Sequence, residues 1–278
     1  MTSGDISGLI ERVVEHTRSC VGEDFVALYA YGSYARGGMD EWSDLDLCLV
    51  LKPSDRYLAS LRGWATRASE MSDATGVRVD PIGLSTDHLG EDVPWDKAFL
   101  LWNLQDNSIL LLGEDVRALM RAPSKEKLRL SAADSALRLV RSIYGIPREQ
   151  PVPRFLPAPD LSLPCETYGN IGRAVAHTVV QGLRALVVLG TGAPCEEKRR
   201  LPEVLKRLGE DSLAAYCADA LALRQEIPAF APLQTVPPRV RKLSECIPGL
   251  AGRLLVALSE HGLTDPSWKP EASGAPGA

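Results

Sequence analysis

The spacing of apolar residues divides the chain into a first part that mixes helices with strands and a second part that contains helices. In the first part, apolar positions recur with the period of a helix over residues 1–18 and 53–76, whereas short β-rich runs predict strands. The expected strands are residues 25–31, 44–51, 77–84 and 109–113. A helix is expected over 114–119. We therefore predict an α/β (α+β) domain over residues 1–122.

From residue 123 onward the pattern is helical. The expected helices are residues 127–144, 165–190, 196–208, 212–226 and 239–262. Six prolines between residues 147 and 164 exclude a helix there, because proline lacks a backbone N–H and clashes with the preceding turn. Residues 265–278 are rich in Pro, Gly and Ala, so we expect a disordered tail. The second domain is thus predicted to be an all-α bundle over residues 123–264.

The most informative stretch runs from Tyr31 to Val50. Gly32 ends a strand and, with Ser33, offers a tight turn whose N–H groups and hydroxyl suit a phosphate where a helix begins. Asp44 and Asp46 then alternate with leucines on the next strand, so both carboxylates point to one face. Such a pair suits Mg²⁺ that also holds substrate phosphates. Each half alone also fits an ordinary turn or solvated charge, but their order along the chain favours a site.

The spacing Gly32-Ser33-x-x-x-Gly37, followed by Ser43-Asp44-x-Asp46-Leu47, resembles the signature of the polymerase-β-type nucleotidyltransferase superfamily. The chain length resembles that of its aminoglycoside adenylyltransferases, of the streptomycin/spectinomycin type. The resemblance implies an N-terminal nucleotidyltransferase domain with a small mixed sheet, and a C-terminal helical bundle that closes the nucleotide cleft. It also implies ATP as co-substrate and two Mg²⁺ ions.

In this superfamily a third carboxylate on a neighbouring strand completes the metal site or takes the proton from the acceptor hydroxyl, and Asp80 matches that position. Asp73 and Asp87 are rival candidates in turn-like surroundings, and Asp80 could also merely end a strand before Pro81. The resemblance makes Asp44, Asp46 and Asp80 the metal ligands and catalytic residues. Gly32 and Ser33 would hold the β- and γ-phosphates.

A polar stripe follows one face of the helix predicted over residues 165–190. It consists of Glu166, Asn170, Arg173, His177, Gln181 and Arg184. The stripe fits either a solvated face or the wall of a polar cleft. Arg184 with Lys198 resembles the spaced Arg and Lys with which the streptomycin/spectinomycin family holds the triphosphate, and His177 resembles its substrate-side histidine.

Three further residues are candidates for binding the nucleotide or the acceptor. Arg36 is either a phosphate or helix-orienting contact or a partner in a surface salt bridge. Glu166 and Asp160 are acidic residues that could bind a cationic acceptor.

Composition narrows the class of protein further. The formal net charge of −5 disfavours a general nucleic-acid binder and suits a cationic substrate. The six cysteines show no C-x-x-C spacing, so reduced thiols are expected. The start of the chain does not resemble a signal peptide and the apolar runs are shorter than a membrane span, so we expect a cytoplasmic protein, monomeric or dimeric.

The predicted function is transfer of AMP from ATP to a hydroxyl of a small polar acceptor, such as an aminoglycoside-like antibiotic, with release of pyrophosphate. The segment after the third carboxylate is shorter than in the streptomycin/spectinomycin enzymes, which leaves those drugs open as substrates. Two alternatives remain: nucleotidylation of a protein or RNA, as in toxin-silencing nucleotidyltransferases, and a catalytically inactive nucleotide sensor.

Overall fold

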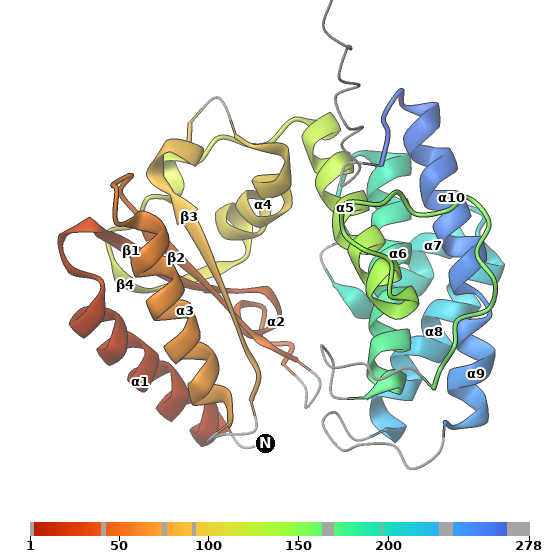
Figure 1. The fold of residues 1–278 in the computed structure, drawn as a ribbon, viewed down its shortest axis with the longest axis horizontal. Helices are drawn as coiled ribbons and strands as arrows, with labels where there is room; N and C mark the ends of the chain where they lie inside the picture. Colours follow the sequence, from red (N-terminus) through yellow and green to blue (C-terminus); the bar gives the residue numbers. More distant parts are fainter. Residues whose placement is uncertain are drawn as a thin grey trace, which may run out of the picture. The chain divides into compact units, whose positions relative to one another are not determined.

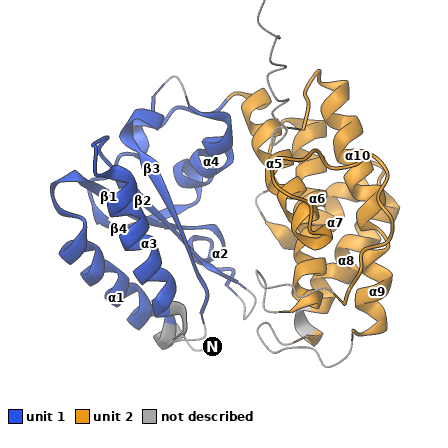
Figure 2. Ribbon diagram, in the orientation of Figure 1, with its two compact units in different colours: residues 1–123 blue, residues 124–278 orange. Residues whose placement is uncertain are grey.

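The computed structural model describes residues 3–39, 43–73, 77–90, 93–162, 170–195, 197–227 and 236–265. The chain divides into two compact units, residues 1–123 and 124–278 (Figure 2). The predicted boundary near residue 122 lies next to this division. Unit 1 holds the described strands, and the regular elements among the described residues of unit 2 are helices (Figure 1). The predicted fold class is confirmed.

Unit 1 is a four-stranded mixed sheet with helices on both faces. Its strands are β1 Phe25–Tyr31, β2 Leu45–Leu51, β3 Val79–Ser85 and β4 Ser108–Gly113. Its helices are α1 Ser3–Cys20, α2 Gly32–Ala35, α3 Tyr57–Asp73 and α4 Ala98–Asp106, with 3₁₀ turns η1 Gly22–Asp24, η2 Thr86–His88, η3 Trp95–Lys97 and η4 Arg117–Leu119. The strand order is β3-β2-β1-β4. Strands β2 and β3 are parallel, which requires the crossover that α3 supplies, and the other pairs are antiparallel.

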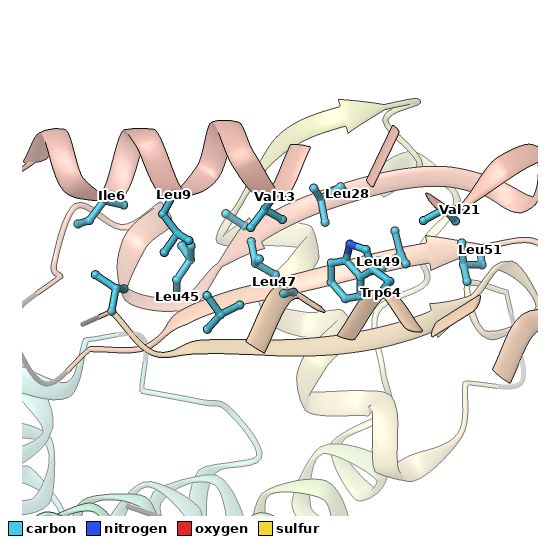
Figure 3. Packing of buried hydrophobic residues seen from close by; sticks show 14 residues of the cluster. Ile6, Leu9, Val13, Val21, Leu28, Leu45, Leu47, Leu49, Leu51 and Trp64 are labelled. Atoms are coloured by element: carbon cyan, nitrogen blue, oxygen red, sulfur yellow. The ribbon is translucent and has the colours of Figure 1, made fainter. Parts of the chain in front are cut away.

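Alternation along β2 explains how the sheet builds a core on each face. Leu45, Leu47, Leu49 and Leu51 are fully buried and point to the face covered by α1 and α3 (Figure 3). Trp64 of α3 closes this core, and its indole Nε1 donates a hydrogen bond of 2.9 Å to Thr17 Oγ1 of α1.

The opposite face of the sheet carries a second core. Cys48 and Val50 of β2 and Tyr29 of β1 pack there with Leu101 and Leu104 of α4. The period-2 pattern of the strands therefore decides which residues face α4, and the polar residues at one end of the sheet follow the same alternation.

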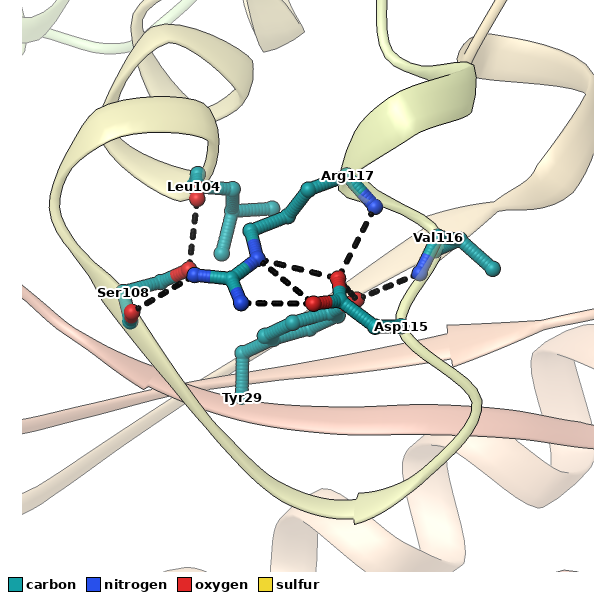
Figure 4. A network of polar contacts seen from close by, with 6 residues as sticks. All are labelled: Tyr29, Leu104, Ser108, Asp115, Val116 and Arg117. Atoms are coloured by element: carbon teal, nitrogen blue, oxygen red, sulfur yellow. Dashed lines mark hydrogen bonds and ion pairs between the residues drawn. The ribbon is translucent and has the colours of Figure 1, made fainter.

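The segment after β4 is held by side chains rather than by a helix, so the helix predicted over 114–119 is wrong. The Tyr29 hydroxyl accepts a hydrogen bond from the Val116 N–H (2.8 Å) and donates one to Asp115 Oδ1 (3.1 Å). Arg117 binds the Asp115 carboxylate through Nε and Nη2, and its Nη1 donates to the Ser108 carbonyl (Figure 4). Within this segment only the 3₁₀ turn η4 forms.

Unit 2 is a bundle around one central helix. Its helices are α5 Lys125–Tyr144, α6 Ile171–Thr191, α7 Leu201–Arg207, α8 Asp211–Glu226, α9 Pro238–Ser244 and α10 Ile247–Glu260, with the 3₁₀ turn η6 Lys198–Arg200. Helix α6 contacts the other five helices. By length and composition alone it could cross a membrane, but most of it is buried, as in the core helix of a folded bundle. Its N-cap is Asn170, whose Oδ1 accepts from the Arg173 N–H at 2.8 Å.

Two other expectations for unit 2 are corrected. The single helix predicted over 239–262 is interrupted between α9 and α10, because Pro248 has no N–H to donate to the Ser244 carbonyl and instead lies in the first turn of α10. Asp265, assigned to the disordered tail, is buried. It forms an ion pair with Arg141 of α5, and it accepts a hydrogen bond of 3.1 Å from the Val152 N–H. Residues 266–278 lie outside the described part of the chain.

Candidate active site

Strand pairing places three polar side chains in one row across the sheet. Tyr31, the last residue of β1, pairs with Asp46 of β2, and Asp46 pairs with Asp80 of β3. By alternation all three face the side of the sheet that carries α4, beyond the core formed with Tyr29 and Cys48. The row therefore forms the polar end of an otherwise apolar surface.

Gly32 is required where β1 turns away from this row. Its φ of +70° is in the left-handed region, which L-residues with a Cβ adopt at a cost. A Cβ at this position would lie 1.9 Å from Asp46 Oδ2, so the Asp46 carboxylate occupies the space that only glycine leaves open. The turn is closed by two backbone hydrogen bonds, from Gly37 N–H to the Tyr34 carbonyl (3.0 Å) and from Gly38 N–H to the Ser33 carbonyl (2.9 Å).

The helix expected after Ser33 is present but consists of the single turn α2. A turn this short contributes little dipole, so an anion here would depend on the N–H groups of the Gly32–Ser33 turn itself. Arg36 is the half-buried C-cap of α2.

The third carboxylate lies beside the other two, because Asp80 pairs with Asp46 across the parallel strands. The pKa of Asp80 is raised, first by partial desolvation of its carboxyl group and second by the negative charge of Asp44, and it is opposed by the positive charge of Arg78. Asp44 lies directly before β2, whose first residue, Leu45, donates its N–H to the Arg78 carbonyl at 2.8 Å. The structure thus brings Asp44, Asp46 and Asp80 to one end of unit 1.

Comparison with known proteins indicates which class of domain carries this carboxylate cluster. Residues 14–89, which contain every residue of the cluster, match the family model described as nucleotidyltransferase domain. This segment is a nucleotidyltransferase domain. The prediction of a nucleotidyltransferase is confirmed by this match, and the predicted resemblance to the aminoglycoside adenylyltransferases is confirmed at the level of the fold by the structure that follows.

Among solved structures, the chain is similar to the spectinomycin adenyltransferase AAD(9) from Enterococcus faecialis, solved with ATP and spectinomycin. The TM-score is 0.60 at 12% sequence identity, over 91% of this chain and 99% of that chain. At this identity the likeness concerns the fold of both units. The search of curated proteins gave no match.

The donor set of the nucleotidyltransferase domain fits a divalent cation that is shared with substrate. Within the described residues, no three His, Cys, Asp or Glu side chains are arranged so that they could hold a metal ion by themselves. Mg²⁺ does not need such a cage, because it commonly binds one or two carboxylates and completes its shell with phosphate oxygens and water. The aligned carboxylates beside the Gly32–Ser33 turn meet that requirement.

The residues expected to act from the helical domain belong to unit 2. Arg184 is buried on α6, where its Nη1 donates to Gln181 Oε1 (3.2 Å) and its Nη2 to the Cys195 carbonyl (3.5 Å). This second bond connects α6 to the segment that leads into η6, which begins at Lys198. The two cations are therefore on neighbouring segments of unit 2.

The polar stripe on α6 is not a solvated face. Asn170, Arg173 and Arg184 are buried, and His177 is half-buried. Glu166 lies outside the described residues. The exposed Asp160 accepts hydrogen bonds from the N–H and hydroxyl of Ser162, which lower the pKa of its carboxyl group.

One member of the cluster was missed from the sequence. Tyr31 lies next to the motif, and its pKa is raised well above the usual value, first by burial and then by the charges of Asp46 and Asp80. Alternation from Tyr29 could have placed it on the carboxylate face, but the register that sets it beside Asp46 is a property of the folded sheet.

Proposed function

We propose that the protein is a Mg²⁺-dependent adenylyltransferase that moves AMP from ATP to a hydroxyl of a small polar, cationic acceptor of the aminoglycoside type. The observation that carries the proposal is the placement of Asp44, Asp46 and Asp80 at one end of the sheet beside the Gly32–Ser33 turn. The similar solved structure contains ATP and spectinomycin, which supports both the donor and the class of acceptor.

Each residue of the domain has a defined task in this reaction. The Gly32–Ser33 turn binds the β- and γ-phosphates through N–H groups and a hydroxyl. Asp44 and Asp46 would hold a Mg²⁺ ion, which would supply positive charge to neutralise the phosphates and the leaving group. Asp80, on the strand beside Asp46, takes the proton of the acceptor hydroxyl.

The acceptor oxygen forms a bond to the α-phosphorus, the bond from that phosphorus to the bridging oxygen breaks, and pyrophosphate leaves with the electron pair. Arg184 and Lys198 of unit 2 bind the triphosphate and stabilise the departing pyrophosphate. His177 and Glu166 contact the acceptor.

The test is incubation of the purified protein with Mg²⁺, each of four α-labelled nucleoside triphosphates and a panel of aminoglycosides and related hydroxylated compounds, followed by mass spectrometry. We expect one panel member to gain the mass of AMP. Label on co-purified protein or RNA would instead support the alternative acceptors, and an absence of transfer and of nucleotide binding would refute the proposal.

Two asparagine variants test the site, and a third serves as their matched control. Asp80→Asn and Asp46→Asn should each lower the transfer rate on the order of 100-fold or more, as when one preorganised electrostatic group is removed. Asp87→Asn, an exposed position in η2 after the same strand, should leave the rate unchanged. Loss of transfer in Asp87→Asn with full activity in Asp80→Asn would assign the third carboxylate to Asp87.

A further inference from the structure

A histidine and a cysteine lie together on the surface of α1, and no step of the proposed reaction uses them. His16 and Cys20 are four residues apart, so their side chains lie on one face of the helix. The Cys20 Sγ atom lies 3.5 Å from the His16 Nε2 atom. Cys20 is exposed and His16 is half-buried, so an ion from the solvent can reach both atoms.

The distance between these two atoms suits a shared metal ion. Zinc binds a cysteine sulfur at about 2.3 Å and a histidine nitrogen at about 2.0–2.1 Å, usually in tetrahedral geometry. These bond lengths and the tetrahedral angle place the two ligand atoms about 3.5–3.6 Å apart. The 3.5 Å between Cys20 Sγ and His16 Nε2 is therefore the separation that one Zn²⁺ ion bound to both atoms requires.

The surroundings of the pair favour the form of histidine that binds metals. The pKa of His16 is lowered, first by partial burial and then by the positive charge of Arg67, and it is opposed by the negative charge of Glu70. A neutral imidazole has a nitrogen lone pair to donate to a metal, whereas an imidazolium does not. Cys20 is also the last residue of α1, where the helix dipole favours positive charge.

The pair lies apart from the carboxylate cluster within unit 1. Helix α1 packs on the leucine face of the sheet, whereas Asp46 and Asp80 face the side that carries α4. The two places also differ in chemistry, because carboxylates suit Mg²⁺ and Mn²⁺ whereas a thiolate and an imidazole suit Zn²⁺. A metal bound to His16 and Cys20 would therefore occupy a second site of unit 1.

We propose that His16 and Cys20 form a surface binding site for Zn²⁺, with Nε2 and Sγ as the two protein ligands and water in the remaining positions. Binding ionises the Cys20 thiol, whose proton passes to the solvent. No group of three His, Cys, Asp or Glu side chains that could hold a metal exists among the residues that the structure describes, so the site is an open one. This inference does not depend on the proposed function.

The test measures Zn²⁺ binding to the reduced, full-length protein by isothermal titration calorimetry, with excess Mg²⁺ present to occupy sites made of oxygen ligands. His16→Ala and Cys20→Ser should each lower Zn²⁺ affinity about tenfold or more, because loss of a group that only orients a metal ligand already costs about that much. Co²⁺ is a second probe, and it should give a thiolate-to-metal charge-transfer band in the wild type that is absent in Cys20→Ser. Unfolding temperatures without metal should stay unchanged, since both positions lie on the helix surface.

Two control variants show whether the pairing of the two side chains matters. Cys246→Ser removes another cysteine that is not fully buried, and it should leave Zn²⁺ affinity unchanged. The double variant His16→Ala/Arg18→His keeps the number of histidines but moves the imidazole off the face that carries Cys20, so affinity should stay low. Wild-type affinity in His16→Ala, in Cys20→Ser or in the double variant would overturn the proposal. An equal loss in Cys246→Ser, or a wild-type protein that does not bind Zn²⁺, would overturn it as well.

Discussion

Replacement of Gly32 by alanine should separate the shape of the site from the stability of the fold. Alanine at φ +70° costs about 1–2 kcal/mol of backbone strain. Its Cβ would also lie 1.9 Å from Asp46 Oδ2, whereas a relaxed C···O contact is about 3.3 Å or longer. The carboxylate must therefore retreat by about 1.4 Å, and displacements of this size at a reacting centre cost on the order of 100-fold in rate.

Gly22→Ala is the matched control for the cost of backbone strain. Gly22 has φ +66°, almost the value of Gly32, but a Cβ there meets nothing within 4 Å. Both variants should lose about 1–2 kcal/mol of unfolding free energy in urea titrations, and Gly32→Ala somewhat more. Only Gly32→Ala should lose nucleotidyl transfer and Mn²⁺ affinity.

Two results would refute this reasoning. Wild-type transfer and Mn²⁺ affinity in Gly32→Ala would mean that the position of the Asp46 carboxylate is not critical. An equal loss of activity in Gly22→Ala would mean that strain anywhere near β1, rather than displacement of the carboxylate, disables the site.

Three further predictions concern the interactions that stabilise each unit from within. Arg141→Met should destabilise unit 2 by about 3–5 kcal/mol in urea unfolding, because it leaves Asp265 as an uncompensated buried charge. Combining it with Asp265→Leu should recover most of the lost stability. A double variant whose loss of stability equals the sum of the two single losses would contradict this. Leu47→Ala should cost about 2–5 kcal/mol because its side chain is fully buried between the sheet and its helices, and a loss below about 1 kcal/mol would show that the core can collapse around it. The pKa of Tyr29 is raised to about 12 in the folded state, so the stability that its protonated hydroxyl contributes is complete below its ordinary pKa of 10 and is lost as the pH rises from 10 to 12. The difference in unfolding free energy between the wild type and Tyr29→Phe should therefore shrink across that range, and a constant difference would disprove the assignment.

The sequence was sufficient where a short-range pattern decides the outcome. The period-2 alternation of Leu45 and Leu47 with Asp44 and Asp46 predicts a strand that buries one set and presents the other, and the structure has β2 in that orientation. The helical spacing at the start of the chain likewise predicts α1. In these elements the local conformational propensity and the pattern of burial favour the same secondary structure, so the sequence alone predicts them correctly.

Tertiary contacts decided the remaining features. Residues 114–119 have a helical composition, but the segment is fastened to β1 through the Tyr29 hydroxyl, which binds Asp115 and the Val116 N–H, and only the 3₁₀ turn η4 forms. The polar residues of α6 look like a solvated stripe in sequence, yet Arg184 is buried because other helices surround α6 on several sides.

The row of Tyr31, Asp46 and Asp80 shows the same limit at the site itself. The sequence determined that Asp46 faces away from the leucines of β2, and it marked Gly32 as the point where the chain turns. Which residues of β1 and β3 lie beside Asp46 depends on strand register, and a shift of one residue would move every side chain to the other face. Register is set by the packing of both faces of the sheet at once, a long-range property that only the folded structure contains.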